Sequence, residues 1–198
     1  TTDVGDDDNV VLIAGPFRPT DGGCECEYRF KFDGAATTFP AIYAGFSETM
    51  AFDTPVMPAE FATATMTYNG TGGMVGAQMD VDGTTDDFRA CAGDAAAATG
   101  GAANGARANE TLTADEWYLV RVELHPDGNA TVYVGHKGDQ MDIIAIASPV
   151  QGRSFNGPVV TNTDQQYAVL MAENRTGAAR VFEVDYFFAR GFRDWANT

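Results

Sequence analysis

The segment from Thr113 to Gly135 constrains the fold more than any other part of the sequence, because it reads as two strands joined by a tight turn. In the first arm, apolar side chains recur at every second position from Tyr118 to Leu124, which is the period of a half-buried strand. Pro126 and Gly128 then supply the backbone angles of a turn. Pairing the arms across His125–Asn129 places three apolar pairs on one face: Leu124 with Ala130, Val122 with Val132, and Val120 with Val134. The sequence therefore predicts an antiparallel β-hairpin in this register.

Short apolar or alternating runs bounded by Gly and Pro recur along the whole chain, and none has the period of a long amphipathic helix. Besides the hairpin we expect strands at 10–14, 24–32, 41–46, 61–68, 74–81, 88–91, 141–147, 166–171 and 180–192. The runs 61–68 and 74–81 are expected to pair through the glycine-rich connection 69–73. In the last strand, the pattern predicts that Phe182, Val184, Tyr186 and Phe188 share a core-facing side. These signals indicate an all-β protein, a single antiparallel β-sandwich of the jelly-roll type.

The 198 residues suffice for one sandwich domain with a full core, which we expect to span residues 10–198. Residues 1–9 are acidic and polar and are expected to form an N-terminal arm. The segment 92–108 is nearly all Ala and Gly, and we expect a long surface excursion there.

The charge balance argues against two classes of partner. The net charge is −16, with 28 acidic and 12 basic residues and only two lysines, Lys31 and Lys137. Nucleic acid and anionic membrane surfaces both require basic patches, so neither is expected as a partner. No apolar run approaches the roughly 18 residues of a membrane span.

Three cysteines leave two possibilities open. Cys24 and Cys26 lie on one face of the same predicted strand, a poor geometry for bonding to each other. Either one of them pairs with Cys91, or all three are reduced thiols that pack as small apolar residues, which the pattern favours. The Cys-x-Cys spacing does not match a zinc finger, and we expect no bound metal.

Two segments resemble a known superfamily. Asp115–Leu124 with Asp127–Val134, and the closing run Phe182–Phe192, are similar to the central hairpin and the last strand of concanavalin A-like domains, which include legume lectins, laminin G-like modules and several glucanases. The resemblance implies a jelly-roll sandwich whose closing strand pairs beside the first strand. Because its motifs are structural, it implies little about function.

The resemblance raises one enzymatic possibility. Retaining glucanases of this superfamily carry an E-x-D-x-x-E strand, whose two glutamates lie about 5 Å apart and cleave the glycosidic bond in two steps. This chain has Glu183 and Asp185 in that pattern, but Phe188 stands where the second glutamate is required. We therefore expect no catalytic residues and no enzymatic activity.

The acidic turn from Asp80 to Asp87 is the one candidate for a cation. Asp80, Asp82, Asp86 and Asp87 lie close together in sequence, and Gly83 allows a tight turn. Carboxylates from a loop suit Ca²⁺, but the spacing matches no EF-hand and acidic turns are common in so acidic a chain. No cofactor is expected, and the question of calcium at Asp80–Asp87 stays open.

Two classes of function fit these observations, and the sequence assigns no binding residues. The first, which we expect, is a non-enzymatic virion structural protein of the capsid-decoration type, a homo-oligomer (a trimer is favoured) that contacts the major capsid protein. The alternative is a secreted carbohydrate-binding or adhesion module, for which exposed aromatic residues would stack on sugars. Contacts are expected from Thr1–Asn9 and from the loops around Asp82 and Gly100. The candidate aromatic residues are Trp195, Tyr43, Tyr68 and Tyr133.

Overall fold

The computed structural model describes residues 9–33, 41–50, 56–62, 65–69, 72–82, 88–93, 113–136, 153–154, 160–161, 163–175 and 181–192. These residues form twelve β-strands and one 3-10 turn, η1 (Pro19–Asp21). The strands are β1 (Asn9–Phe17), β2 (Cys24–Phe32), β3 (Ala41–Ser47), β4 (Ala59–Ala62), β5 (Thr65–Tyr68), β6 (Met74–Met79), β7 (Arg89–Gly93), β8 (Tyr118–Leu124), β9 (Ala130–His136), β10 (Arg153–Ser154), β11 (Gln166–Glu173) and β12 (Phe182–Gly191). No helix in this part of the chain is long and apolar enough to cross a lipid bilayer.

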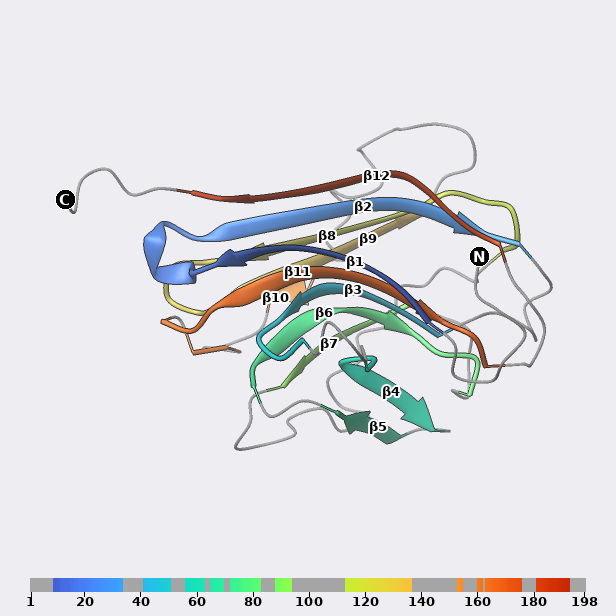
Figure 1. Ribbon diagram of the computed structural model, residues 1–198, viewed down its shortest axis with the longest axis horizontal. Helices are drawn as coiled ribbons and strands as arrows, with labels where there is room; N and C mark the ends of the chain where they lie inside the picture. The colour runs from blue at the N-terminus through green and yellow to red at the C-terminus, as the bar shows by residue number, and fades with distance from the viewer. Residues whose placement is uncertain are drawn as a thin grey trace.

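Two five-stranded antiparallel sheets pack face to face (Figure 1). Sheet A has the strand order β1-β11-β3-β6-β7, and sheet B has the order β10-β9-β8-β2-β12. Their inner faces together bury a large apolar cluster, to which sheet B contributes mainly aromatic residues and valines and sheet A contributes mainly alanines. The predicted fold class, an all-β antiparallel sandwich, is confirmed.

The hairpin β8–β9 has the predicted register. Leu124 pairs with Ala130, Val122 with Val132, and Val120 with Val134. Burial along β8 alternates strictly, so one side of the strand faces the core and the other faces outward. The predicted strand 24–32 is likewise confirmed as β2, which pairs with β8 on one side and β12 on the other.

Two kinds of contact join the strands through the core. The Tyr28 hydroxyl of sheet B donates a hydrogen bond of 2.9 Å to the Gly45 carbonyl of sheet A, so a buried polar group is satisfied across the sandwich. Aromatic rings also stack within sheet B, Tyr28 on Phe187 at 5.1 Å and Phe32 on Tyr118 at 5.6 Å between ring centroids.

The predicted facing of the last strand is confirmed for Phe182 and Val184, which pack on the core, and is wrong from Tyr186 onward, because β12 contains a β-bulge. The register shifts between Val184 and Tyr186, which leaves Asp185 as an extra residue opposite β2. Beyond the bulge the alternation is inverted, so Phe187 packs on the core whereas Tyr186 and Phe188 lie on the outer face. A strict period of two cannot reveal an inserted residue.

The predicted pairing of 61–68 with 74–81 is also wrong. The first run is divided into β4 and β5, which pair with each other as a separate two-stranded sheet. β6 pairs instead with β3 and β7 in sheet A. Figure 1 shows β4 and β5 outside sheet A, on the side away from sheet B. There the segment Met57–Ala59 packs on the outer face of sheet A, so β6 is buried on both faces.

Three further expectations can be compared with the structure. The closing strand β12 pairs with β2, and not beside β1 as the resemblance implied; β1 is the edge strand of the other sheet. Cys24, Cys26 and Cys91 are all free and buried, in agreement with the favoured interpretation. The expected strand 141–147 and most of the segment 92–108 lie outside the described residues.

Candidate functional site

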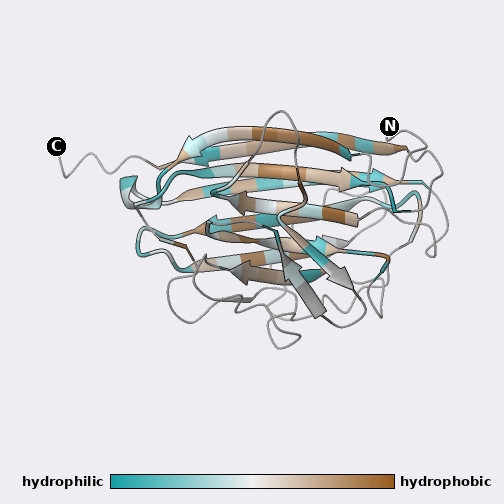
Figure 2. Ribbon diagram, turned by 60° about the horizontal axis from the view of Figure 1, so that its bottom comes forward, coloured by the Kyte–Doolittle hydropathy of each residue, from teal (hydrophilic) through white to brown (hydrophobic). Residues whose placement is uncertain are grey.

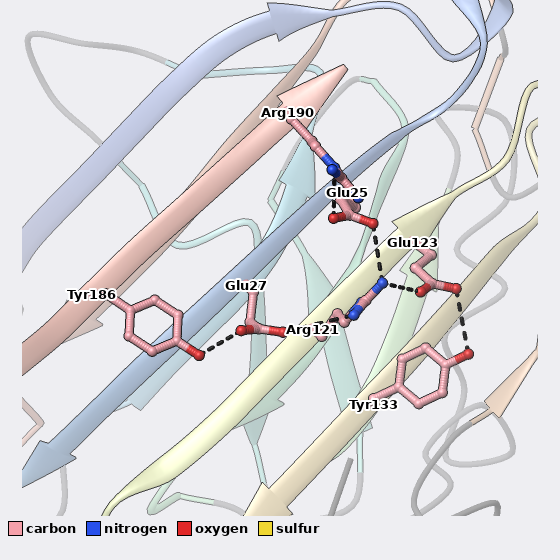
Figure 3. Close-up of polar contacts among 7 residues, drawn as sticks. All are labelled: Glu25, Glu27, Arg121, Glu123, Tyr133, Tyr186 and Arg190. Carbon is pink, nitrogen blue, oxygen red and sulfur yellow. Dashed lines mark hydrogen bonds and ion pairs between the residues drawn. The ribbon is translucent and has the colours of Figure 1, made fainter. Parts of the chain in front are cut away.

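The outer face of sheet B carries a network of charged residues and tyrosines from four neighbouring strands. We call it the charged lattice, and Figure 3 shows its members: Glu25, Glu27, Arg121, Glu123, Tyr133, Tyr186 and Arg190. Strand alternation places these side chains outward, because their neighbours in sequence fill the core. Register then brings the strands' charges together, since Glu27 lies directly opposite Arg121 and Glu25 directly opposite Glu123.

Arg121 lies at the centre of the charged lattice. Its Nη2 lies 3.1 Å from Glu25 Oε2 and 2.6 Å from Glu123 Oε1, and its Nη1 lies 3.9 Å from Glu27 Oε2. Arg190 Nε holds the other oxygen of Glu25 at 2.8 Å, and the Glu25 side chain is only 9% exposed. Burial alone lowers the pKa of Arg121, but the charges of the three carboxylates outweigh it and raise that pKa. The guanidinium is therefore a permanent cation.

Two tyrosines complete the hydrogen bonds of these carboxylates. The Tyr186 hydroxyl donates to Glu27 Oε1, and the Tyr133 hydroxyl donates to Glu123 Oε2 at 3.4 Å. Burial and the hydrogen bond to Glu27 raise the pKa of Tyr186 well above its ordinary value. The bulge at Asp185 makes this contact, because it turns Tyr186 to the outer face.

The two acids that resemble a glucanase motif lie beside the charged lattice, and each has a cationic partner. Asp185 pairs with Arg29 Nη1, and Glu183 Oε1 lies 3.2 Å from Lys31 Nζ. The Arg29 guanidinium also covers the ring of Trp117, at 4.4 Å from the ring centroid. Both carboxylates are thus engaged in ion pairs, which suits a structural role better than proton transfer.

At one end of the sandwich, η1, the β8–β9 turn and the C-terminal end of β12 lie close together (Figure 1). Residues of these segments line a hollow there. Its larger part is a cleft of about 400 Å³. The lining combines two aromatic rings with charged and amide groups: Pro16, Phe17, Arg18, Asp21, Gln165, Gly191 and Phe192. Figure 2 shows hydrophilic colour at this end of the molecule, in contrast with the hydrophobic middle stretches of the strands.

A smaller pocket of about 220 Å³ adjoins this cleft. Glu25 and Glu123 of the charged lattice contribute to its wall, together with His125 of the hairpin turn. Phe192 lines both hollows and is 40% exposed, and the Arg190 guanidinium lies 4.5 Å from its ring centroid. We call the two hollows together the rim groove.

A second ionic cluster lies at the opposite end of the sandwich. Arg175 pairs with Glu173 at 2.7 Å, Glu60 at 3.4 Å and the buried Asp80 at 3.5 Å. Asp80 Oδ1 also accepts a hydrogen bond from the backbone N–H of Asp82, 3.1 Å away. Among the described residues no group of three acids, histidines or cysteines is arranged to hold a metal ion. Asp86 and Asp87 lie outside the described part of the chain.

The aromatic residues proposed for sugar stacking lie in different surroundings. Tyr43 is buried under the outer layer of sheet A, where its hydroxyl donates to the Phe46 carbonyl, so it is not a surface platform. Tyr133 is half-buried in the charged lattice, while Trp195 and the side chain of Tyr68 lie outside the described residues. The sequence analysis missed Phe17 and Phe192, since no sequence signal shows that residues so far apart line one groove.

Comparisons with known proteins define the fold. No family model and no curated protein sequence matches this chain. Among solved structures, the carbohydrate recognition domain of Emp47p has a TM-score of 0.58 at 13% identity, over 96% of this chain and 80% of that one. The exoplasmic/lumenal domain of VIP36, in its Ca²⁺/Man2-bound form, has a TM-score of 0.58 at 8% identity, over 98% and 74%.

A Shewanella oneidensis protein of unknown function also has a similar structure, with a TM-score of 0.50 at 11% identity. The match covers 95% of this chain but 65% of that one, so this chain spans about two thirds of its length. At these identities the comparisons show the fold alone, a sandwich of two antiparallel β-sheets similar to the folds of the Emp47p and VIP36 domains.

Proposed function

We propose that this protein is a carbohydrate-binding module that takes a short oligosaccharide in the rim groove, with residues 10–198 acting as one domain. The observation that carries the proposal is the groove itself, two hollows that share the 40% exposed Phe192 as a lining residue. The volume of the larger part, about 400 Å³, lies within the range of small-molecule sites.

The lining of the groove matches the chemistry of a pyranose. A sugar ring has an apolar C–H face, which packs on aromatic rings, and a periphery of hydroxyls that both donate and accept hydrogen bonds. Phe17 and Phe192 supply apolar faces. Arg18 supplies donors, Asp21 supplies acceptors, and the amide of Gln165 supplies both.

The similar structures support the same class of ligand. Emp47p is represented by its carbohydrate recognition domain, and VIP36 by a form with Man2 bound. Phe188 stands where the glucanase motif requires its second glutamate, so β12 lacks the pair of carboxylates that cleavage by this mechanism needs, which supports a role in binding.

Carbohydrate binding is better supported than the virion function expected from the sequence. That function depends on subunit contacts, which were expected from Thr1–Asn9 and from the loops around Asp82 and Gly100. Most of these surfaces (residues 1–8, 83–87 and 94–112) lie outside the described residues. No similar structure cited above is a capsid protein, whereas two have carbohydrate-binding descriptions. The proposal therefore places the protein in an extracellular or lumenal setting.

The test compares two phenylalanines of one strand end. Phe192 and Phe188 are 40% and 42% exposed, but Phe192 alone of the two lines the groove. A glycan array with wild-type protein identifies the ligand, and isothermal titration calorimetry then measures its affinity. We expect Phe192→Ala to weaken binding by tenfold or more and Phe188→Ala to leave it unchanged. A blank array, or equal losses in both variants, would contradict the proposal.

A further inference from the structure

A buried amide behind the rim groove has no hydrogen-bond partner. Gln166, the first residue of β11, has no exposed surface, and neither its Nε2 nor its Oε1 is hydrogen-bonded. Buried side-chain amides are almost always satisfied, so an amide without partners needs a physical reason. Such exceptions concentrate where a group is kept for function at the expense of stability.

Gln166 lies at the groove end of the core. It faces the same side of β11 as Ala168 and Leu170, which pack in the core, while its neighbour Gln165 lines the groove. In the β1–β11 ladder Gln166 pairs directly with Phe17. Residues that pair directly share a face of the sheet, so the amide and the Phe17 ring are neighbours on the inner side.

Phe17, the ladder partner of Gln166, is also a lining residue of the groove. It is half-buried, lines the larger hollow, and meets Phe46 edge-on at 6.3 Å between ring centroids. A Cβ atom added to Gly15 would lie 3.3 Å from Phe17 Cδ2, and one added to Gly191 would lie 3.2 Å from Cδ1. The ring therefore fills the gap between the edge strands β1 and β12, in space that two glycines leave free.

We infer that Phe17 is a movable plug and that Gln166 is the polar anchor of an inner extension of the rim groove. Rotation of the ring out of the gap beside Gly15 and Gly191 opens the wall and presents the amide to a ligand. This inference rests on the proposed function and sharpens its ligand class. An amide offers a donor and an acceptor side by side, which matches two adjacent hydroxyls of a pyranose.

The binding test uses Gln166→Leu, which removes the amide at similar volume. Removing an unsatisfied polar group from the core raises the melting temperature. The same variant should bind the oligosaccharide identified on the array at least tenfold more weakly than wild type. Gln78→Leu is the matched control, because Gln78 is equally buried but lies in β6, where its Nε2 donates to the Ala59 carbonyl. Unchanged affinity in Gln166→Leu overturns the anchor while the proposed function stands.

Hydrogen exchange tests the plug without any ligand. The side-chain amide signals of Gln166 are assigned in an NMR spectrum by their loss in Gln166→Leu. If Phe17 moves, these protons exchange through a local opening, faster than the core backbone amide of Leu170, and Phe17→Ala accelerates them tenfold or more. Exchange at the rate of global unfolding overturns the plug, whatever the array shows. A blank array overturns the proposed function and the anchoring role together, and leaves the exchange rate to decide on the plug alone.

Discussion

The outer faces of the two sheets differ in polarity. The outer face of sheet A is apolar, with Met74, Val169 and Met171 buried beneath the segment Met57–Ala59. The outer face of sheet B is polar and carries the charged lattice (Figure 3). The additional strands β4 and β5 lie on the side of sheet A (Figure 1). Among the described residues, apolar packing thus characterises the outer face of sheet A and paired charges that of sheet B.

The largest expected effect is on the shared core. Val122→Asp places an unpaired charge at a fully buried position on the inner side of β8. We expect loss of the cooperative fold, because a buried charge without a partner is among the costliest single changes. Thermal melting followed by circular dichroism checks this. A soluble variant with an unchanged melting temperature would refute the facing of β8.

The second prediction addresses the comparison of the faces directly. Met171→Asp on the outer face of sheet A should cost about 3 kcal/mol or more, because that position is fully buried. Leu119→Asp on the outer face of sheet B should cost less than about 1 kcal/mol, since Leu119 is only half-buried. Urea denaturation of both variants gives the two values. Equal costs would show that the faces do not differ in this way.

The third prediction concerns the close approach of two strands in sheet A. Gly76 lies directly opposite Gly45, and a Cβ atom at Gly76 would stand 2.5 Å from the Ala44 carbonyl oxygen and 3.0 Å from Tyr43 Cζ. We expect Gly76→Ala to destabilise the protein by about 1–3 kcal/mol through this overlap. Urea denaturation measures it, and a stability equal to wild type would show that the strands can separate freely.

The fourth prediction removes the centre of the charged lattice. Arg121→Met leaves Glu25, Glu27 and Glu123 close together without their shared cation, and we expect a loss of about 1–2 kcal/mol. Arg190→Met should cost at most about 0.5 kcal/mol, because that side chain is 52% exposed and its ion pair is screened by solvent. The difference between the variants should shrink in high salt. An equal loss of stability in the two variants would contradict the central role of Arg121 in the charged lattice.

The smallest effect concerns alkaline pH. Folding raises the pKa of Tyr186, so between the ordinary tyrosine pKa near 10 and the higher folded value the native state holds a proton that the unfolded chain releases. Stability should therefore fall as the pH rises above about 10. Tyr186→Phe should weaken this decline, and Tyr133→Phe should weaken it less. Melting temperatures between pH 8 and 11 test the order of the variants.

Local patterns predicted a large part of the fold. The hairpin register and the strand Cys24–Phe32 followed from alternation, because each strand has one face in the core and one outside. In sheet A the same rule does not predict which side chains face the core. All residues of β6 are buried, so its sequence does not alternate between apolar and polar residues. The rule also fails at Asp185, where a single extra residue inverts the sides of β12.

The candidate site could not be predicted from local sequence patterns. Its walls come from residues 16–21, from Gln165 and from residues 191–192, which meet only because β1, β11 and β12 end at one side of the sandwich. Glu25 is only 7% exposed and pairs with Arg121 and Arg190, which come from the two neighbouring strands. That the same residue also lines a hollow depends on tertiary packing alone.

The bulge at Asp185 also affects how copies of the molecule meet. β12 is an edge strand of sheet B, and a regular ten-residue edge would offer a continuous row of backbone groups to another chain. The extra residue interrupts that row at its middle, so an incoming strand cannot stay in register along the whole edge. Deleting Asp185 would restore a straight edge with an apolar Phe188 beside it, and with it a template for aggregation. One inserted residue thus protects the sheet from growing beyond its own chain.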